Sequence, residues 1–336
     1  MKKMTAVVLA LALVLALSAC GAQAEAKPEE NLTKLKVAYM PNWGALWAVA
    51  TADNKGYFAE EGLEIDFVQV EEGPTEVAAL ESEGIDVAYI GQGPHKLCST
   101  GVAQVFLLQH LGQADFIIGL NGVNALEDLR GKKVGYAAGT ASETLLTNAL
   151  ASVGMTMDDI EAVSLEAVSL TAAAISSNVD AISVWNPFAE TILAEDENAV
   201  KICTNADFPS VFAPGSWVVN PAWAKEHTDT LVRFARAMYK AMDYASAAST
   251  DDAIAEEVAG YIAGVMKGDP EAVLSQRYDG TWLSKADIVG GLENGELLNY
   301  YGNQQAAFIA SGVLDADSVL APEEFVLVDI MKEAAN

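Results

Sequence analysis

Short apolar runs alternate with helical patterns through most of this chain, and that alternation constrains its fold more than any other feature. Strands are predicted at 35–39, 63–70, 85–90, 115–120, 134–136, 162–165 and 181–185. Helices are predicted between them at 45–54, 73–83, 95–100, 143–152 and 170–176. Repeated strand–helix units of this kind favour parallel sheets with helices on both faces.

The alternation restarts near the middle of the chain, which predicts two lobes. Segment 212–219 has the pattern of a crossing back to the first lobe, and the chain from 221 onward is mostly helical. We therefore expect an α/β fold of two lobes joined by two crossover segments. The expected bounds are 34–121 with 220–336 for lobe 1, and 122–219 for lobe 2. Because strand carboxyl ends and helix amino ends converge between such lobes, the cleft is the natural ligand site.

The first residues of the chain predict export and lipidation. Two lysines precede the apolar run 5–17, which is too short to span a membrane and is typical of a secretory signal. Its end, Leu-Ser-Ala followed by Cys20, resembles the bacterial lipobox, in which the cysteine becomes the lipidated first residue of the mature protein. An ordinary cleaved signal with a chance cysteine is the alternative. With 21–33 as a flexible spacer, these features predict an extracytoplasmic domain anchored to the cell membrane, at the surface or in the periplasm.

The charge of the chain excludes one class of partner. The formal net charge is −28, from 19 Lys and Arg against 47 Asp and Glu. Such a surface repels a phosphate backbone and offers no basic stripe, so nucleic acid is not a partner. The net charge does not decide the sign of a small ligand, because local groups set the charge of a pocket.

The sequence predicts neither a cofactor nor a metal. Cys98 and Cys203 are expected to be buried free thiols, with a disulfide between them as the alternative. His95, His110 and His227 have no cysteine or carboxylate at ligand spacing around them. The sequence also contains no glycine-rich phosphate loop, nucleophile elbow or His-Glu-x-x-His motif. These observations favour a binding protein over an enzyme.

Several short segments, taken in order, resemble the nitrate/sulfonate/taurine substrate-binding proteins of ABC importers, a group that includes pyrimidine-precursor binders. The most specific is the block Gly-Tyr-Phe-Ala-Glu-Glu-Gly-Leu-Glu at 56–64, and the others are Tyr39, 84–88, 128–135 and 180–188. The resemblance covers nearly the whole mature chain. It implies a bilobal periplasmic-binding-protein fold of type II that closes on one small molecule. It also implies a monomer that delivers this solute to permease and ATPase subunits.

Two other functions stay open beside transport. The pyrimidine-precursor synthases share the family pattern, but they need a cysteine-rich iron-binding segment that this sequence lacks. An enzyme is therefore not expected. A surface sensor that signals without importing its ligand is the remaining alternative.

Candidate ligand-binding residues lie in three loops that follow predicted strands and at two further tryptophan positions. Trp43, Trp185 and Trp217 offer aromatic walls, and the glycines permit close approach of backbone N–H groups. The full set is Asn42, Trp43, Gly91, Gln92, Gly93, His95, Gly139, Thr140, Ser142, Glu143, Trp185, Asn186 and Trp217.

The third loop opens a predicted helix, which gives it two interpretations. Backbone donors and the positive helix end at Gly139–Glu143 suit a sulfonate or carboxylate head. The same groups, with Thr140 or Ser142, would serve equally as a helix cap. No arginine lies in the candidate loops, so a guanidinium clamp for sulfonate is not predicted. A flat heterocycle or a zwitterion would fit equally, with Glu143 pairing an amino group.

Overall fold

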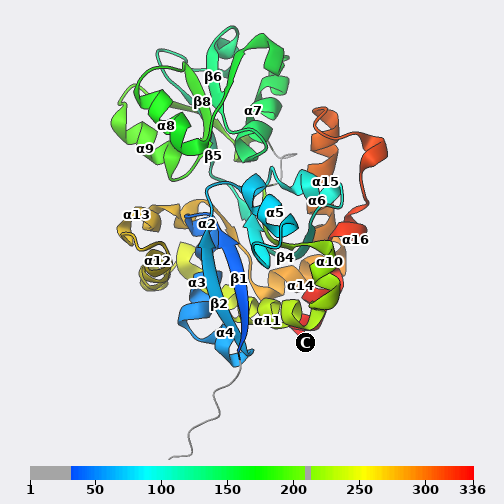
Figure 1. Ribbon diagram of the computed structural model, residues 1–336. Helices are drawn as coiled ribbons and strands as arrows, with labels where there is room; N and C mark the ends of the chain where they lie inside the picture. The colour runs from blue at the N-terminus through cyan, green and yellow to red at the C-terminus, as the bar shows by residue number, and fades with distance from the viewer. Residues whose placement is uncertain (1–31, 209–212) are drawn as a thin grey trace, which may run out of the picture. The chain divides into compact units, whose positions relative to one another are not determined.

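A computed structural model describes residues 32–208 and 213–336 (Figure 1). The predicted signal, Cys20 and the spacer up to residue 31 lie outside the described residues. By its contacts, Lys34–Asn336 forms one unit that holds both sheets. Among the described residues, no helix combines the length and the apolar character needed to cross a bilayer.

The first sheet has six strands in the order β11-β4-β10-β3-β1-β2. Strands β1 and β3 run parallel, whereas β10 runs antiparallel to both β3 and β4, and β11 runs antiparallel to β4. The strands are β1 (Thr33–Tyr39), β2 (Leu63–Gln69), β3 (Val87–Ile90), β4 (Gln104–Gly112), β10 (Pro214–Val219) and β11 (Gly280–Trp282).

Helices from both ends of the chain surround this sheet. Those that precede β4 are α2 (Trp43–Leu46), α3 (Val49–Asn54), α4 (Tyr57–Glu60), α5 (Gly73–Glu81) and α6 (His95–Ser99). Those that follow β10 are α10 (Pro221–Glu226), α11 (Thr228–Ala245), α12 (Asp252–Met266), α13 (Glu271–Leu274), α14 (Lys285–Asn294), α15 (Glu296–Ala310), α16 (Pro322–Phe325) and α17 (Val328–Ala335).

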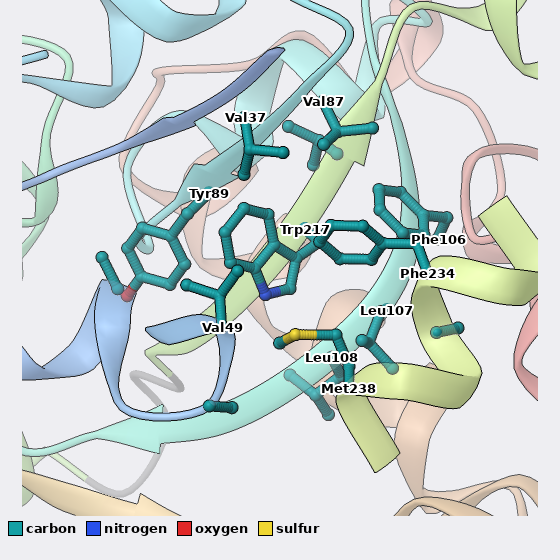
Figure 2. Close-up of a cluster of buried hydrophobic side chains, with 14 of the residues drawn as sticks. Val37, Val49, Val87, Tyr89, Phe106, Leu107, Leu108, Trp217, Phe234 and Met238 are labelled. Atoms are coloured by element: carbon teal, nitrogen blue, oxygen red, sulfur yellow. The ribbon is translucent and has the colours of Figure 1, made fainter. Parts of the chain in front are cut away.

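The core of the first sheet is built around Trp217 of β10. Its ring makes edge contacts with Phe234 of α11 and with Tyr89 of β3, at centroid distances of 5.4 and 5.9 Å (Figure 2). Helix α11 supplies this core because its apolar side chains recur at helical spacing, from Leu231 through Phe234 to Met238, and form one buried face. The same apolar face holds the helix against the sheet.

The second sheet has five strands in the order β7-β6-β8-β5-β9 and buries both of its faces. Helix α7 packs on one face, and α8 with α9 packs on the other, so that the sheet lies between two separate apolar clusters (Figure 1). The strands are β5 (Asp115–Gly119), β6 (Lys133–Tyr136), β7 (Glu161–Ser164), β8 (Ala181–Trp185) and β9 (Val200–Thr204). The helices are α7 (Ala141–Ser152), α8 (Ala167–Ile175) and α9 (Phe188–Glu195).

The two-sheet α/β architecture is confirmed, but the expectation of parallel sheets is wrong for several strands. β6 is parallel to β7 and β8, whereas β5 is antiparallel to β8 and β9. Strands that carry the chain from one sheet to the other enter their new sheet in the opposite direction. Both sheets are therefore mixed.

Sheet membership also differs from the expected lobe bounds at two strands. The expected bounds put 115–119 in lobe 1 and 214–219 in lobe 2, yet β5 pairs with strands of the second sheet and β10 with strands of the first. The chain passes between the sheets one strand away from the expected bounds, because apolar runs predict a strand without specifying its partners. Cys98 and Cys203 are buried free thiols, as expected.

Candidate functional site

A cavity of about 730 Å³, including the space at its mouth, is lined by residues that follow strands of both sheets. Six of the predicted residues line it: Asn42, Gly91, Gln92, Thr140, Trp185 and Asn186. Sequence reasoning missed the other polar and aromatic lining residues, which are Tyr89, His110, Asp115, Gln276, Asp279 and Trp282. Segments far apart in the sequence therefore meet at one place.

One local and one long-range hydrogen bond hold the first-sheet side of the cavity. Asn42 caps helix α2, its Oδ1 accepting the backbone N–H of Ala45 at 2.8 Å. Gln276 lies in the 3₁₀ turn Ser275–Tyr278, and its Oε1 accepts the backbone N–H of Trp43 at 3.0 Å. The Gln276 bond fixes the loop after β1 against the segment before β11.

Asp115 and Trp185 form the second-sheet side. They lie directly opposite each other in the antiparallel pair of β5 and β8. Side chains at opposite positions project from the same face of a sheet. The backbone N–H of Asp115 donates to Oδ1 of Asn205 at 3.2 Å, which fixes the start of β5. A carboxyl group and a half-buried indole are thereby presented side by side to the cavity.

Asn186 connects this side to a second carboxyl group. Its Nδ2 donates to both carboxyl oxygens of Asp279, at 3.0 Å each. The side-chain Oδ1 of Asn186 is buried and has no hydrogen-bond partner among the described residues. Asp279 is further tied to the crossing between the sheets, because its carbonyl accepts the backbone N–H of Gln113 at 2.7 Å.

Burial shifts the ionisation of the groups around the cavity toward their neutral forms. Desolvation raises the pKa of Asp115 to about 7. Desolvation also raises the pKa of Asp279 to about 7, although the Asn186 hydrogen bond acts in the other direction. His110 has a pKa lowered to about 3 by burial, so it is neutral at physiological pH. Its Nε2 lies 3.3 Å from the hydroxyl oxygen of Tyr89.

The start of helix α7 is a cap made by the chain's own groups. The Thr140 Oγ1 accepts the N–H of Ser142 at 3.2 Å and donates to the carbonyl of Ala137. Glu143 accepts the N–H of Gly139 at 2.8 Å and lies 3.6 Å from the ammonium of Lys96. The protein's own carboxylate thus occupies the positive helix end that we expected to suit an anionic head.

The remaining predicted residues are not among those that line the cavity. Trp43 and Trp217 are fully buried in the core of the first sheet, and the indole N–H of Trp217 donates to Gln109 at 3.0 Å. His95 is buried in a network with Ser216, and burial lowers its pKa to about 4. Ser142 donates to the carbonyl of Ser183, inside the second-sheet region. These four side chains are used internally.

Gly93 and Gly139 contribute through the backbone. A Cβ on Gly93 would lie 2.3 Å from the carbonyl carbon of Thr140, so the two backbones are closer than any side chain allows. Gly139 has φ +79°, a left-handed conformation that favours glycine at this turn. The close approach brings the loop after β3 against the start of α7, beside the cavity.

Sequence signals existed for part of what was missed. His110 and Asp115 lie on either side of the junction between β4 and β5. Ligand-binding side chains in α/β folds are commonly found at strand ends, so both positions could have been predicted. Asp279 precedes the three-residue strand β11 and has no periodic pattern around it. Within the described ranges, no group of three or more His, Cys, Asp or Glu side chains is placed to hold a metal ion.

Comparisons with known proteins place these features in a family context. A family model described as "NMT1/THI5 like" matches residues 45–250. A protein of Brucella abortus described as a binding protein is 26% identical over 296 residues, covering 88% of this chain and 90% of the relative. A Bacillus subtilis protein described as aliphatic sulfonates-binding is 25% identical over 241 residues, 69% of this chain and 71% of the relative.

A solved structure shows the same fold at low sequence identity. The periplasmic nitrate-binding protein of Synechocystis superposes with a TM-score of 0.73 and 14% identity, covering 90% of this chain and 88% of that chain. The similarity identifies the fold of periplasmic binding proteins, as expected from the sequence.

Proposed function

The chain belongs to the NMT1/THI5 like family, and from this we propose that it is the solute-binding component of an ABC importer. In this function, the chain captures one small solute outside the cytoplasm and delivers it, chemically unchanged, to permease and ATPase subunits. The observation that carries the proposal is the cavity itself, because its lining comes from both sheets and includes several residues predicted as ligand contacts. A site built by two sheets is suited to enclosing a solute and releasing it again.

The proposed solute class follows the family resemblance. Sulfonates, nitrate and taurine are the first candidates, and a flat heterocycle such as a pyrimidine precursor is the alternative. The walls formed by Trp185, Trp282 and Tyr89 support a solute with an apolar or flat portion. A sensor that binds the same solute without transport is distinguished by its gene neighbourhood, since a permease and ATPase would favour import and a histidine kinase would favour signalling.

We further propose the cellular setting and the domain division. The signal-like start and Cys20 support export and lipid anchoring, and the chain is proposed to act as a monomer. Strand membership supports lobe bounds with β5 in the second lobe and β10 in the first. The crossings would then lie between β4 and β5, and between β9 and β10.

A thermal-shift screen of the mature chain tests the proposed function. Sulfonates, nitrate, taurine, pyrimidines and amino-acid derivatives form the panel. A solute at about a hundredfold excess over its Kd stabilises the folded state by about 2.7 kcal/mol, which corresponds to a rise in Tm of roughly 5 °C. Calorimetry should then show one molecule bound per chain. Failure of every solute to bind, or chemical conversion of a bound solute, would contradict the proposal.

Gly93→Ala tests the close approach beside the cavity. The added methyl group would collide with the backbone of Thr140, and overpacking of this kind costs about 1–3 kcal/mol. If the contact is part of the solute-bound state, the Kd for a solute found in the screen should rise roughly ten- to hundredfold. Gly260→Ala is the matched control, because a Cβ there meets nothing within 4 Å. Equal Kd values for Gly93→Ala and the unmodified protein would exclude a role for this approach in binding.

A further inference from the structure

The charged groups of the cavity have one sign. Asp115 and Asp279 are carboxylic acids, and no Lys or Arg occurs among the described residues that line the cavity. His110 supplies no positive charge, because its burial keeps the imidazole neutral at physiological pH. An anion bound here would find no cationic side chain in the lining and would face two acids.

Asp115 is available to a ligand. It is 7% exposed, and its carboxyl oxygens have no hydrogen bond or ion pair with the described residues. A buried carboxylate without a partner is costly, and a charge-assisted hydrogen bond from a ligand would offset that cost. Asp115 is the second acid of a pair, since its charge also raises the pKa of Asp279.

Asn186 gives independent evidence that the cavity binds a ligand with hydrogen-bond donors. The residue is 6% exposed and lines the cavity, and its Nδ2 donates to Asp279 and, at 3.5 Å, to Oε1 of Glu190. Its Oδ1 is a buried acceptor without a partner. A ligand that donates hydrogen bonds would satisfy Asn186 and both carboxyl groups at once, whereas an anion would satisfy none of these acceptors.

Aromatic side chains of the cavity also favour a cationic ligand. Trp185 lies opposite Asp115 on the strand pair, and Trp282 and Tyr89 also line the cavity. Indole and phenol faces attract cations. Carboxylates beside aromatic faces are a combination that suits an organic cation. A metal ion is a poor alternative, since no group of three candidate ligands exists in the described part of the chain.

We propose that the solute carries a positively charged nitrogen, a protonated amine or an amidinium, that binds between Asp115 and Asp279 against the face of Trp185. This inference rests on the proposed function and narrows its substrate class. Among the solutes considered above, an aminosulfonate or an aminated heterocycle meets the requirement, and nitrate or a simple alkanesulfonate does not.

The ionisation of the pair gives the proposal a pH dependence. Asp279 faces Asp115, Glu190 and Lys201, and Asp115 also faces Tyr89. With both acids near a pKa of about 7, a cation binds the ionised forms and displaces protons. Its affinity should therefore rise between pH 6 and pH 8, with proton release on binding.

Two pairs of probes of matched shape test the inference. Benzamidine is compared with neutral benzamide, and taurine with propane-1-sulfonate, in which a methyl group replaces the ammonium. Calorimetry on the mature chain should show that the member of each pair with a cationic nitrogen binds about tenfold or more tightly. Asp115→Asn and Asp279→Asn should each reduce that preference, and the surface variant Asp66→Asn should leave it unchanged.

The outcomes separate this inference from the proposed function. Equal affinity within both pairs, no binding of any of the four probes, or a preference unchanged in both aspartate variants would overturn the cation site. If a solute without a cationic nitrogen binds in the screen and the two variants do not weaken it, the proposed function stands and this inference fails. If no solute of any charge binds, both fail.

Discussion

Trp217→Ala should lower the free energy of unfolding by about 3–5 kcal/mol, the usual loss when a large aromatic side chain is removed from a core. The residue is fully buried and contacts Phe234 and Tyr89 (Figure 2). The variant also leaves the Oε1 of Gln109 without its indole donor. Urea denaturation followed by circular dichroism measures the loss.

Two tryptophan variants serve as comparisons. Trp223 is half-buried in helix α10, so Trp223→Ala should cost clearly less free energy of unfolding than Trp217→Ala. Trp185→Ala should weaken solute binding more than it lowers stability, because its half-buried ring lines the cavity. A Trp217→Ala protein as stable as Trp223→Ala would show that this ring is not central to the core.

Asp115→Asn should stabilise the unliganded protein above pH 7, by on the order of 2 kcal/mol. The folded protein holds this carboxyl in a desolvated position that raises its pKa to about 7, compared with 3.8 in the unfolded chain. Ionising it at higher pH therefore costs free energy in the folded state only. An asparagine has nothing to ionise, so it avoids that cost.

The pH dependence has a definite sign. Between pH 4 and pH 7 the folded state binds more protons at this site than the unfolded state does, so stability falls as the pH rises. The gain from Asp115→Asn should be near zero at pH 4 and complete above pH 7. Asp279, whose pKa is also about 7, contributes in the same direction, so the single variant removes only part of the slope.

Thermal or urea unfolding at pH 4.5 and pH 8 measures the effect. Asp66→Asn is the matched control, because it removes one exposed carboxylate from a protein of net charge −28 without altering the cavity. A gain for Asp115→Asn that is the same at both pH values, or equal to that of Asp66→Asn, would contradict the proposed cost of ionising Asp115.

The sequence predicted local structure better than strand partnership. The alternating run at 63–70 became β2, and the apolar run at 181–185 became β8. Which sheet each strand joins depends on long-range pairing, and this is why the sheets of 115–119 and 214–219 differ from those that the expected bounds imply. The short strand β11 has no pattern of its own, since three residues are too few to show a period.

In the candidate site, too, the sequence predicted local features better than long-range ones. Loops after strands located Asn42, Gln92 and Thr140 at the cavity, because strand ends converge there in folds of this class. Trp185 ends its predicted strand and Trp217 lies within the predicted crossing 212–219, and the sequence alone does not reveal which ring points toward a core. Asp279 lies far along the sequence from the three loop residues, and only the tertiary fold brings it to the cavity.

The junction of β4 and β5 has a consequence for solute exchange. Gln113 and Ala114 alone separate the two strands, and both are tethered, the first to Asp279 and the second to the backbone of Asn186. A rotation of one sheet relative to the other would require changes in the few backbone torsion angles of this junction. Ala114 and Asp115 also line the cavity. The residues about which the sheets would rotate and the residues that would contact the solute therefore lie in one short segment.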